Sequence, residues 1–226
     1  AAVAQELLTA PLVQWPALLD QPSPDRFGKY GWDSTWPLLR SALDQARAVV
    51  PDPAFIILTG DLIAHRFKQR FEETIGRADE SDYRRFVAKT ATFVGEEIIK
   101  RFPGKRVFLT LGNEDSECGN YKLTPQGHFL HETLPLARQL TGADDPTFER
   151  DWVMGRGYDL SSPDIPKLRL VYVNSVYLSA EYRNACDRGA ADAGDETMAW
   201  LAERLAAAER AGDKVWLLFH IPPGAD

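Results

Sequence analysis

The stretch FIILTGDLIAH, Phe55–His65, decides how the rest of the chain is interpreted. Its first residues, Phe55–Leu58, are all apolar and predict a short strand that is buried on both faces. The carboxylate of Asp61 follows this strand, at the position where open α/β sheets gather their ligand-binding groups. His65 comes shortly after it. A carboxylate that only makes a turn is the competing interpretation of Asp61, and the later strands decide between the two.

Three more apolar runs predict further strands, over Val107–Leu111, Leu168–Val173 and Val215–Phe219. Segments with helical spacing of apolar residues separate these runs, which indicates α/β architecture with crossover connections. The predicted helices run from the possible caps Asp33, Ser34 and Thr35 to Pro51, and over Asp79–Phe102, Gly127–Leu140 and Asp195–Ala211. Neither a repeat nor a composition break divides the sequence, so residues 1–226 are predicted to form a single domain.

Polar residues follow two of the later strands in the same way as Asp61 follows the first. Asn113 comes after the second strand and His220 after the fourth. Right-handed crossovers keep such strands parallel, so we expect these three side chains to meet at one edge of a sheet. A carboxylate, an amide oxygen and an imidazole suit Zn, Mn or Fe, which can polarise a phosphoryl oxygen and generate hydroxide near neutral pH. A turn asparagine and a buried structural histidine are the competing interpretations of Asn113 and His220.

The composition is that of a globular protein with an acidic balance. Hydrophobic residues make up 44% of the chain, the net charge is −7 and the pI is near 5.2. This balance argues against a nucleic-acid-binding surface or a general membrane-surface binder, because there is no basic field to attract a polyanion. The apolar runs are too short to span a bilayer, and the N-terminal residues do not form an intact signal peptide. Nothing in the sequence indicates an oligomeric state.

Two cysteines, Cys118 and Cys186, lie far apart in the sequence. They can be ordinary buried thiols or the two ends of one long-range disulfide. Both lie in polar, loop-like contexts, SECGNY and RNACDRG, which favours a bridge and an oxidising compartment.

Several blocks of the sequence together resemble a known family. The segments TGDLIAH, LGNEDSECGNY and FHIPPG are similar to the central blocks of the calcineurin-like metallophosphoesterases. The closer resemblance is to the acid sphingomyelinase-like phosphodiesterase branch, which YGWDSTWPLLRSAL and VYVNSVYLS also resemble. The likeness covers most of Tyr30–Gly224, in the same order.

This resemblance implies a four-layer α/β/β/α sandwich, truncated here at one or both ends, with two divalent metal ions, Zn first and Mn or Fe as alternatives. Asp61 then corresponds to the residue that bridges the two metals, and His220 to a ligand of the second metal. Asn113 corresponds to a ligand that also lies near the substrate phosphate. His65 corresponds to a histidine that binds phosphate or protonates the leaving group. The resemblance and the possible disulfide together predict a secreted or periplasmic location.

The chain also departs from the family pattern. The family has His after Gly-Asn, and here that position is Glu114, which can donate a proton only if burial and anionic neighbours raise its pKa. Asp115 and Glu117 are acidic enough to hydrogen-bond to the ligating residues and support them, but exposed loop acids are the favoured interpretation. The family's first Asp-x-His block and its last Gly-x-His block are not found, so either this is a fragment or the metal site is defective.

The sequence therefore predicts a metal-dependent hydrolase of phosphoric esters, with a phosphodiester as the expected substrate. Sphingomyelin-like lipids, nucleotide phosphates and other small-molecule diesters all remain compatible with this prediction. The competing hypothesis is a catalytically inactive binding or interaction domain on the same fold.

Overall fold

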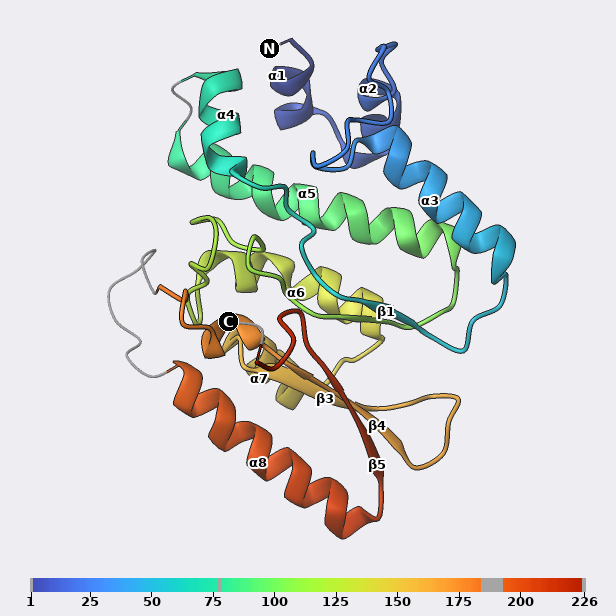
Figure 1. Ribbon diagram of the computed structural model, residues 1–226, viewed down its shortest axis with the longest axis vertical. Helices are drawn as coiled ribbons and strands as arrows, with labels where there is room; N and C mark the ends of the chain where they lie inside the picture. Colours follow the sequence, from blue (N-terminus) through green and yellow to red (C-terminus); the bar gives the residue numbers. More distant parts are fainter. Residues whose placement is uncertain (1, 77–78, 184–192, 225–226) are drawn as a thin grey trace.

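The computed structural model describes residues 2–76, 79–183 and 193–224, and within them helices alternate with short strands (Figure 1). The helices are α1 (Ala2–Thr9), α2 (Trp15–Leu19), α3 (Trp36–Val49), α4 (Phe67–Ile75), α5 (Glu80–Arg101), α6 (His128–Thr141), α7 (Pro146–Val153) and α8 (Ala193–Ala211), with short 3-10 turns at Leu12–Gln14 and Ser175–Leu178. The strands are β1 (Ile56–Leu58), β2 (Val107–Leu109), β3 (Gly157–Ser161), β4 (Leu168–Val173) and β5 (Lys214–Leu218). The chain is therefore a mixed α/β protein, as the sequence predicts.

The described strands form two sheets. β1 and β2 pair in parallel, with Ile57 opposite Phe108. The other sheet has the order β3-β4-β5, in which β3 is antiparallel to β4 and β4 is parallel to β5. The expectation that all predicted strands share one sheet is wrong. β3 is not predicted by the sequence, because GYDLS lacks the uninterrupted apolar run that marks the other strands.

Two of the predicted strands are less buried than expected. Ile57, in the middle of β1, is 37% exposed, so the prediction of a strand buried on both faces is wrong. β5 lies at the edge of its sheet, and Trp216 and Leu217 are also exposed. β2 is buried throughout, as predicted. Apolar composition alone therefore does not determine which strands are covered.

The predicted helices are confirmed, with small shifts at their ends. α3 begins after Thr35, whose side chain accepts a hydrogen bond from the backbone N–H of Leu38, and Pro37 occupies its first turn. α5 begins after Asp79, whose carboxylate accepts from the N–H of Ser81. Asp33 was a possible cap for α3, but its carboxylate makes other contacts, which are described below.

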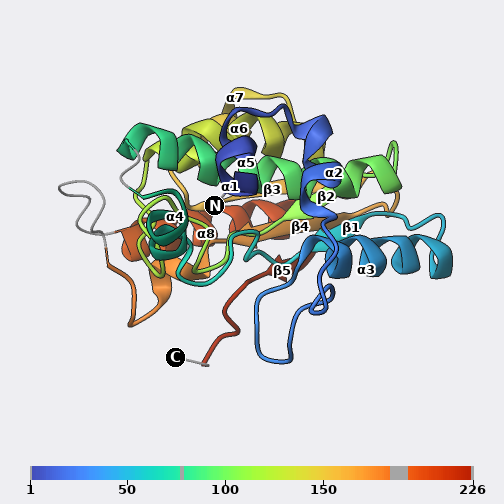
Figure 2. The same cartoon turned by 90° about the horizontal axis from the view of Figure 1, so that it is seen from above.

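The two faces of β4 contribute to different parts of the core. Leu170 and Tyr172 pack in a large cluster with residues of α5, α6 and α7, whereas Val171 and Val173 pack against Trp200 of α8. This alternation follows from the two-residue period of a strand. Figure 2 shows α5, α6 and α7 together on one side of the strands, and α3 lies against α5, where Trp36 contacts Phe93.

Buried hydroxyl groups connect the two sheets. The hydroxyl of Tyr172 on β4 accepts a hydrogen bond from the N–H of Leu111, at 3.0 Å, and the hydroxyl of Tyr158 on β3 donates to the carbonyl oxygen of Leu109, at 2.8 Å. Both bonds are buried, where an unpaired backbone group would be costly. They fix the C-terminal end of β2 against the other sheet, so the loops that follow β2 and β5 lie close together.

Candidate functional site

The loops after β1, β2 and β5 bring together a group of polar side chains that we call the strand-end cluster: Asp61, Asn113 and His220. Nε2 of His220 lies 2.9 Å from Oδ1 of Asn113 and 3.5 Å from Oδ2 of Asp61. The three side chains come from strand ends in two different sheets. Their convergence was expected from the sequence, although their predicted role as metal ligands stays a prediction.

The surroundings of His220 supply more hydrogen-bond acceptors than a neutral imidazole can satisfy. Its Nδ1 lies 2.6 Å from the carbonyl oxygen of Thr59, a distance at which Nδ1–H donates to that oxygen. In a neutral ring with its proton on Nδ1, the other nitrogen would present its lone pair to the oxygens of Asn113 and Asp61. Such a set of converging lone pairs is suited to a cation, and a backbone carbonyl on the far nitrogen is a common way to orient a ligating histidine. The donor set therefore fits one divalent ion.

The close approach of the loops after β1 and β2 depends on two glycines. A Cβ atom on Gly60 would lie 2.5 Å from the backbone nitrogen of Gly112, and Gly60 has a φ of +93°. A Cβ atom on Gly112 would overlap the carboxylate of Asp61 and lie 2.5 Å from its backbone nitrogen. Asp61 itself has a φ of 54°, in the left-handed region that aspartate tolerates better than most residues. The Gly-Asp and Gly-Asn pairs thus allow the two backbones to touch.

The carboxylate of Asp115 connects these two loops by accepting hydrogen bonds from the backbone of each. Its Oδ2 accepts hydrogen bonds from the N–H groups of Asp61 and Gly112, at 2.9 and 2.8 Å. Its Oδ1 accepts from the N–H groups of Leu62 and Ile63, at 2.7 and 3.2 Å. Asp115 is fully buried, so the interpretation of this residue as an exposed loop acid is wrong. Burial raises the pKa of Asp115 to about 7, whereas the N–H donors favour the ionised form.

Glu117 is also buried, at 2% exposure, and the same interpretation is wrong for it. One of its oxygens accepts from the N–H of Phe129 in the first turn of α6. In the sequence, the only indication that Asp115 and Glu117 belong to the site is that they follow closely after the end of a strand. Acids at such positions also occur in ordinary loops.

Asn113 and Glu114 are held by neighbours on either side. The amide nitrogen of Asn113 donates to the side-chain oxygen of Asn120, at 2.8 Å, which leaves its own oxygen directed at His220. The N–H of Glu114 donates to Oδ1 of Asp61, at 3.1 Å. Glu114 is 3% exposed. Burial raises the pKa of its carboxyl and the charges of Asp61 and Asp33 add to the effect, while His65 opposes it. The physical condition for Glu114 as a proton donor is therefore present.

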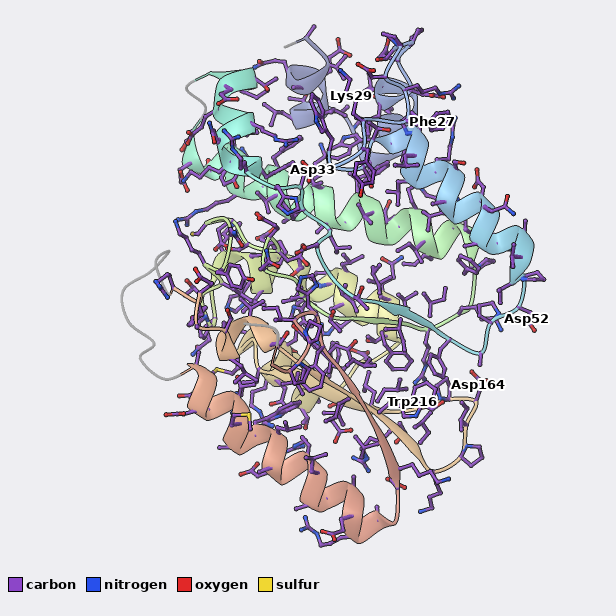
Figure 3. All side chains as sticks on the ribbon, in the orientation of Figure 1. Phe27, Lys29, Asp33, Asp52, Asp164 and Trp216 are labelled. Atoms are coloured by element: carbon purple, nitrogen blue, oxygen red, sulfur yellow. The ribbon has the colours of Figure 1, made fainter. Side chains whose placement is uncertain are left out.

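His65 lies in a second group, the histidine–carboxylate cluster of His65, Asp33 and Arg70. Oδ1 of Asp33 accepts from the N–H of His65, at 3.1 Å, and lies 2.7 Å from its Nδ1. Oδ2 of Asp33 pairs with Arg70, at 2.8 Å. Figure 3 shows Asp33 next to the segment that carries Phe27 and Lys29, near the loop between β1 and α4. Asp33 is not predicted as a site residue by the sequence, because its position before α3 indicates a cap.

The charges in this cluster shift each other's pKa. The hydrogen bond with Asp33 raises the pKa of His65; partial burial acts against this, and the negative charges of Asp33, Glu114 and Asp61 act with it. Burial alone would raise the pKa of Asp33, but the hydrogen bonds from His65 and the charge of Arg70 lower it overall. His65 and Asp33 thus favour the imidazolium–carboxylate pair.

The described residues do not contain a group of three or more His, Cys, Asp and Glu side chains arranged to hold a metal ion. The strand-end cluster contributes one carboxylate and one imidazole, and its third donor is an amide. It fits one cation, and ligands for a second are not found in the part of the chain that the structure describes. The predicted Cys118–Cys186 disulfide also stays a prediction, because Cys186 lies outside the described residues.

Known proteins similar to this chain include sphingomyelinase-type phosphodiesterases and an endopolyphosphatase. The chain is 27% identical over 221 residues to sphingomyelinase phosphodiesterase D of Dictyostelium discoideum, and 28% identical over 214 residues to human acid sphingomyelinase-like phosphodiesterase 3b; these matches cover 95% and 92% of the chain. It is 32% identical over 179 residues, 75% of the chain, to an endopolyphosphatase of Schizosaccharomyces pombe. This chain is a homologue of the acid sphingomyelinase-like phosphodiesterases. The resemblance found in the sequence is therefore confirmed.

The relationship has clear bounds. The chain spans 44% and 43% of the length of the two sphingomyelinase-like relatives, and 28% of the endopolyphosphatase. No family model matches it. Of the helices in the described residues, none has the length and apolar character needed to cross a membrane. The activity, substrate and location of the whole protein are therefore proposed below and are not inferred from the relatives alone.

Proposed function

We propose that this protein hydrolyses phosphoric diesters with the help of a divalent cation held by the strand-end cluster. The observation that carries the proposal is the convergence of Asp61, Asn113 and His220, in a chain homologous to phosphodiesterases. The substrate class is a small-molecule or lipid phosphodiester, in line with the names of the sphingomyelinase-like relatives. A second cation, and Zn rather than Mn or Fe, belong to the same proposal.

Each residue of the cluster has a separate part in this proposal. Asp61, Asn113 and His220 would hold the ion, which when bound would polarise a phosphoryl oxygen and activate water for attack on phosphorus. Asn113 would also contact the substrate phosphate. His65 and Glu114 are the two candidates for protonating the leaving oxygen, and both lie among the charges that surround Asp61.

Hydrolysis of bis(p-nitrophenyl) phosphate by the full-length protein tests the proposal. The Asp61→Ala variant is expected to lose at least about 100-fold in kcat, because cation-assisted stabilisation of a phosphoryl transition state contributes several kcal/mol. Asp164→Ala is the matched control, since Asp164 lies in the exposed loop between β3 and β4, far from the cluster (Figure 3). Unchanged turnover in Asp61→Ala would refute the proposed role of the cluster.

A catalytically inactive binding domain is the rival function. It is favoured by the small number of ionisable ligands that the described residues bring together. A full-length protein that binds neither Zn²⁺ nor Mn²⁺, and does not turn over the diester, would support the rival. A single catalytic domain with a four-layer sandwich and a secreted or periplasmic location remain parts of the main proposal.

A further inference from the structure

Asp33 connects the starts of two helices that are distant in the sequence. It lies just before α3, while His65 lies just before α4. One carboxylate oxygen contacts both the backbone N–H and the Nδ1 of His65, at 3.1 and 2.7 Å. A carboxylate that contacts both the backbone N–H and the ring nitrogen of one histidine restricts both the position and the rotation of that ring. A cap for α3 is not needed from Asp33, because Thr35 already supplies it.

The second oxygen of Asp33 explains how the ionised carboxylate is held. Arg70 on α4 pairs with Oδ2, at 2.8 Å, so the two oxygens have separate partners. The Asp33 side chain is only 16% exposed, whereas those of His65 and Arg70 are 67% and 52% exposed. The carboxylate is therefore the inner member of the cluster, and the imidazole is the member that solvent and substrate can reach.

We propose that Asp33 is a positioning residue that holds the ring of His65 through Nδ1, so that Nε2–H is the donor to the phosphate ester. The inference rests on the proposed function. Of the hydrogen bonds formed by the described residues, none involves Nε2 of His65, which leaves this nitrogen available to a ligand. Two imidazole nitrogens with different partners are the usual arrangement of a histidine that transfers a proton.

In the proposed step, one P–O bond forms as another breaks, and His65 supplies the proton for the leaving oxygen. Water supplies the oxygen of the new P–O bond and releases a proton to solvent, while the bond from phosphorus to the leaving oxygen breaks. The proton on Nε2 of His65 moves to that leaving oxygen, which departs as an alcohol. The ring is left neutral with its remaining proton on Nδ1, which is the tautomer that the Asp33 carboxylate accepts from.

Four charged groups set the protonation of His65. Asp33, Glu114 and Asp61 are negative and favour the imidazolium. Arg70 pairs with Asp33, and its positive charge is expected to oppose the imidazolium. Removing a negative neighbour and removing the positive one should therefore move the titration of His65 in opposite directions. A variant of Asp33 and a variant of Arg70 therefore form a matched pair, for which opposite shifts of the His65 titration are expected.

The experiment is an NMR titration of the His65 ring nitrogens in the full-length protein, with the signal assigned by its absence in His65→Gln. Asp33→Asn keeps an oxygen that can accept from the N–H of His65, but removes the charge, so the His65 titration should shift to lower pH. Arg70→Gln should shift it to higher pH. An unchanged His65 titration in a folded Asp33→Asn protein would overturn the inference.

Turnover adds a second readout. His65→Gln should lower kcat about 100-fold. Asp33→Asn should lower it less, and should have no further effect in the His65→Gln background, because a residue that acts through His65 cannot act without it. Equal losses from Asp33→Asn in both backgrounds would also overturn the inference. The NMR shifts do not depend on turnover, so failure of the proposed function and failure of this inference can be told apart.

Discussion

The strand-end cluster and the histidine–carboxylate cluster lie in the same site but are held by different forces. Asp61 is positioned by backbone contacts: Gly112 touches it, and Asp115 accepts hydrogen bonds from the N–H groups of Asp61 itself, Leu62 and Gly112. His65 is positioned by a side-chain carboxylate and is largely exposed. Buried hydrogen bonds are costly to break, whereas exposed ion pairs contribute little to stability. Mutations that disturb the strand-end cluster should therefore mainly lower the free energy of unfolding. Mutations in the histidine–carboxylate cluster should mainly change the protonation of His65.

The largest effect on stability is expected from Asp115→Asn. The new NH₂ group must replace one carboxylate oxygen, so it would face either the N–H groups of Asp61 and Gly112 or those of Leu62 and Ile63. Two unsatisfied backbone donors should lower the free energy of unfolding by about 3 kcal/mol or more. Urea unfolding followed by circular dichroism measures the loss. Asp164→Asn, in an exposed loop, is the control and should change little; equal stability of the two variants would contradict the described role of Asp115.

A smaller loss is expected from Gly112→Ala. The added methyl group would overlap Asp61, so the ends of β1 and β2 must separate, and overpacking of this kind costs roughly 1–3 kcal/mol. The variant should also lose cation binding, because the carboxylate of Asp61 moves. Gly104→Ala serves as a control: nothing lies within 4 Å of its Cβ position, so only its φ of +76° is strained. If both variants bind the cation as the wild type does, the close approach of the two loops is not needed for the site.

The smallest effect is expected from Arg70→Gln. Arg70 is 52% exposed, and an ion pair at such a position stabilises a protein by at most about 1 kcal/mol. The difference from the wild type should shrink further at high salt, because exposed charges are screened. Thermal unfolding at low and high NaCl concentrations measures both quantities. A loss as large as that of Asp115→Asn would mean that the two clusters do not differ in the way described.

The sequence predicted the parts of the fold and of the site that local patterns determine. Apolar runs with Gly-Asp, Gly-Asn and His at their ends were enough to expect the meeting of Asp61, Asn113 and His220. The order of strands in space was not predicted, because the division into two sheets depends on contacts such as that between Tyr172 and Leu111, which are distant in the sequence.

The supporting carboxylates were harder to identify for the same reason. Asp33 and Asp115 both occupy positions where acids commonly make caps or loops, and the sequence gives no sign of their distant partners. Asp115 is buried only because the loop after β1 folds over it and supplies backbone N–H donors. Roles of this kind arise from tertiary contacts, whereas the strand-end residues are marked by the sequence around them.

The most direct test of the account is a calorimetric titration of the full-length protein with Mn²⁺ and with Zn²⁺, alongside Asp61→Ala, Asn113→Ala and His220→Ala. We expect the wild type to bind at least one of the two ions, and each variant to bind it at least about tenfold more weakly, the loss of about 1.4 kcal/mol that removal of one ligand should exceed. Asp164→Ala should bind as the wild type does. Binding of the ion by all three cluster variants with unchanged affinity would contradict the account.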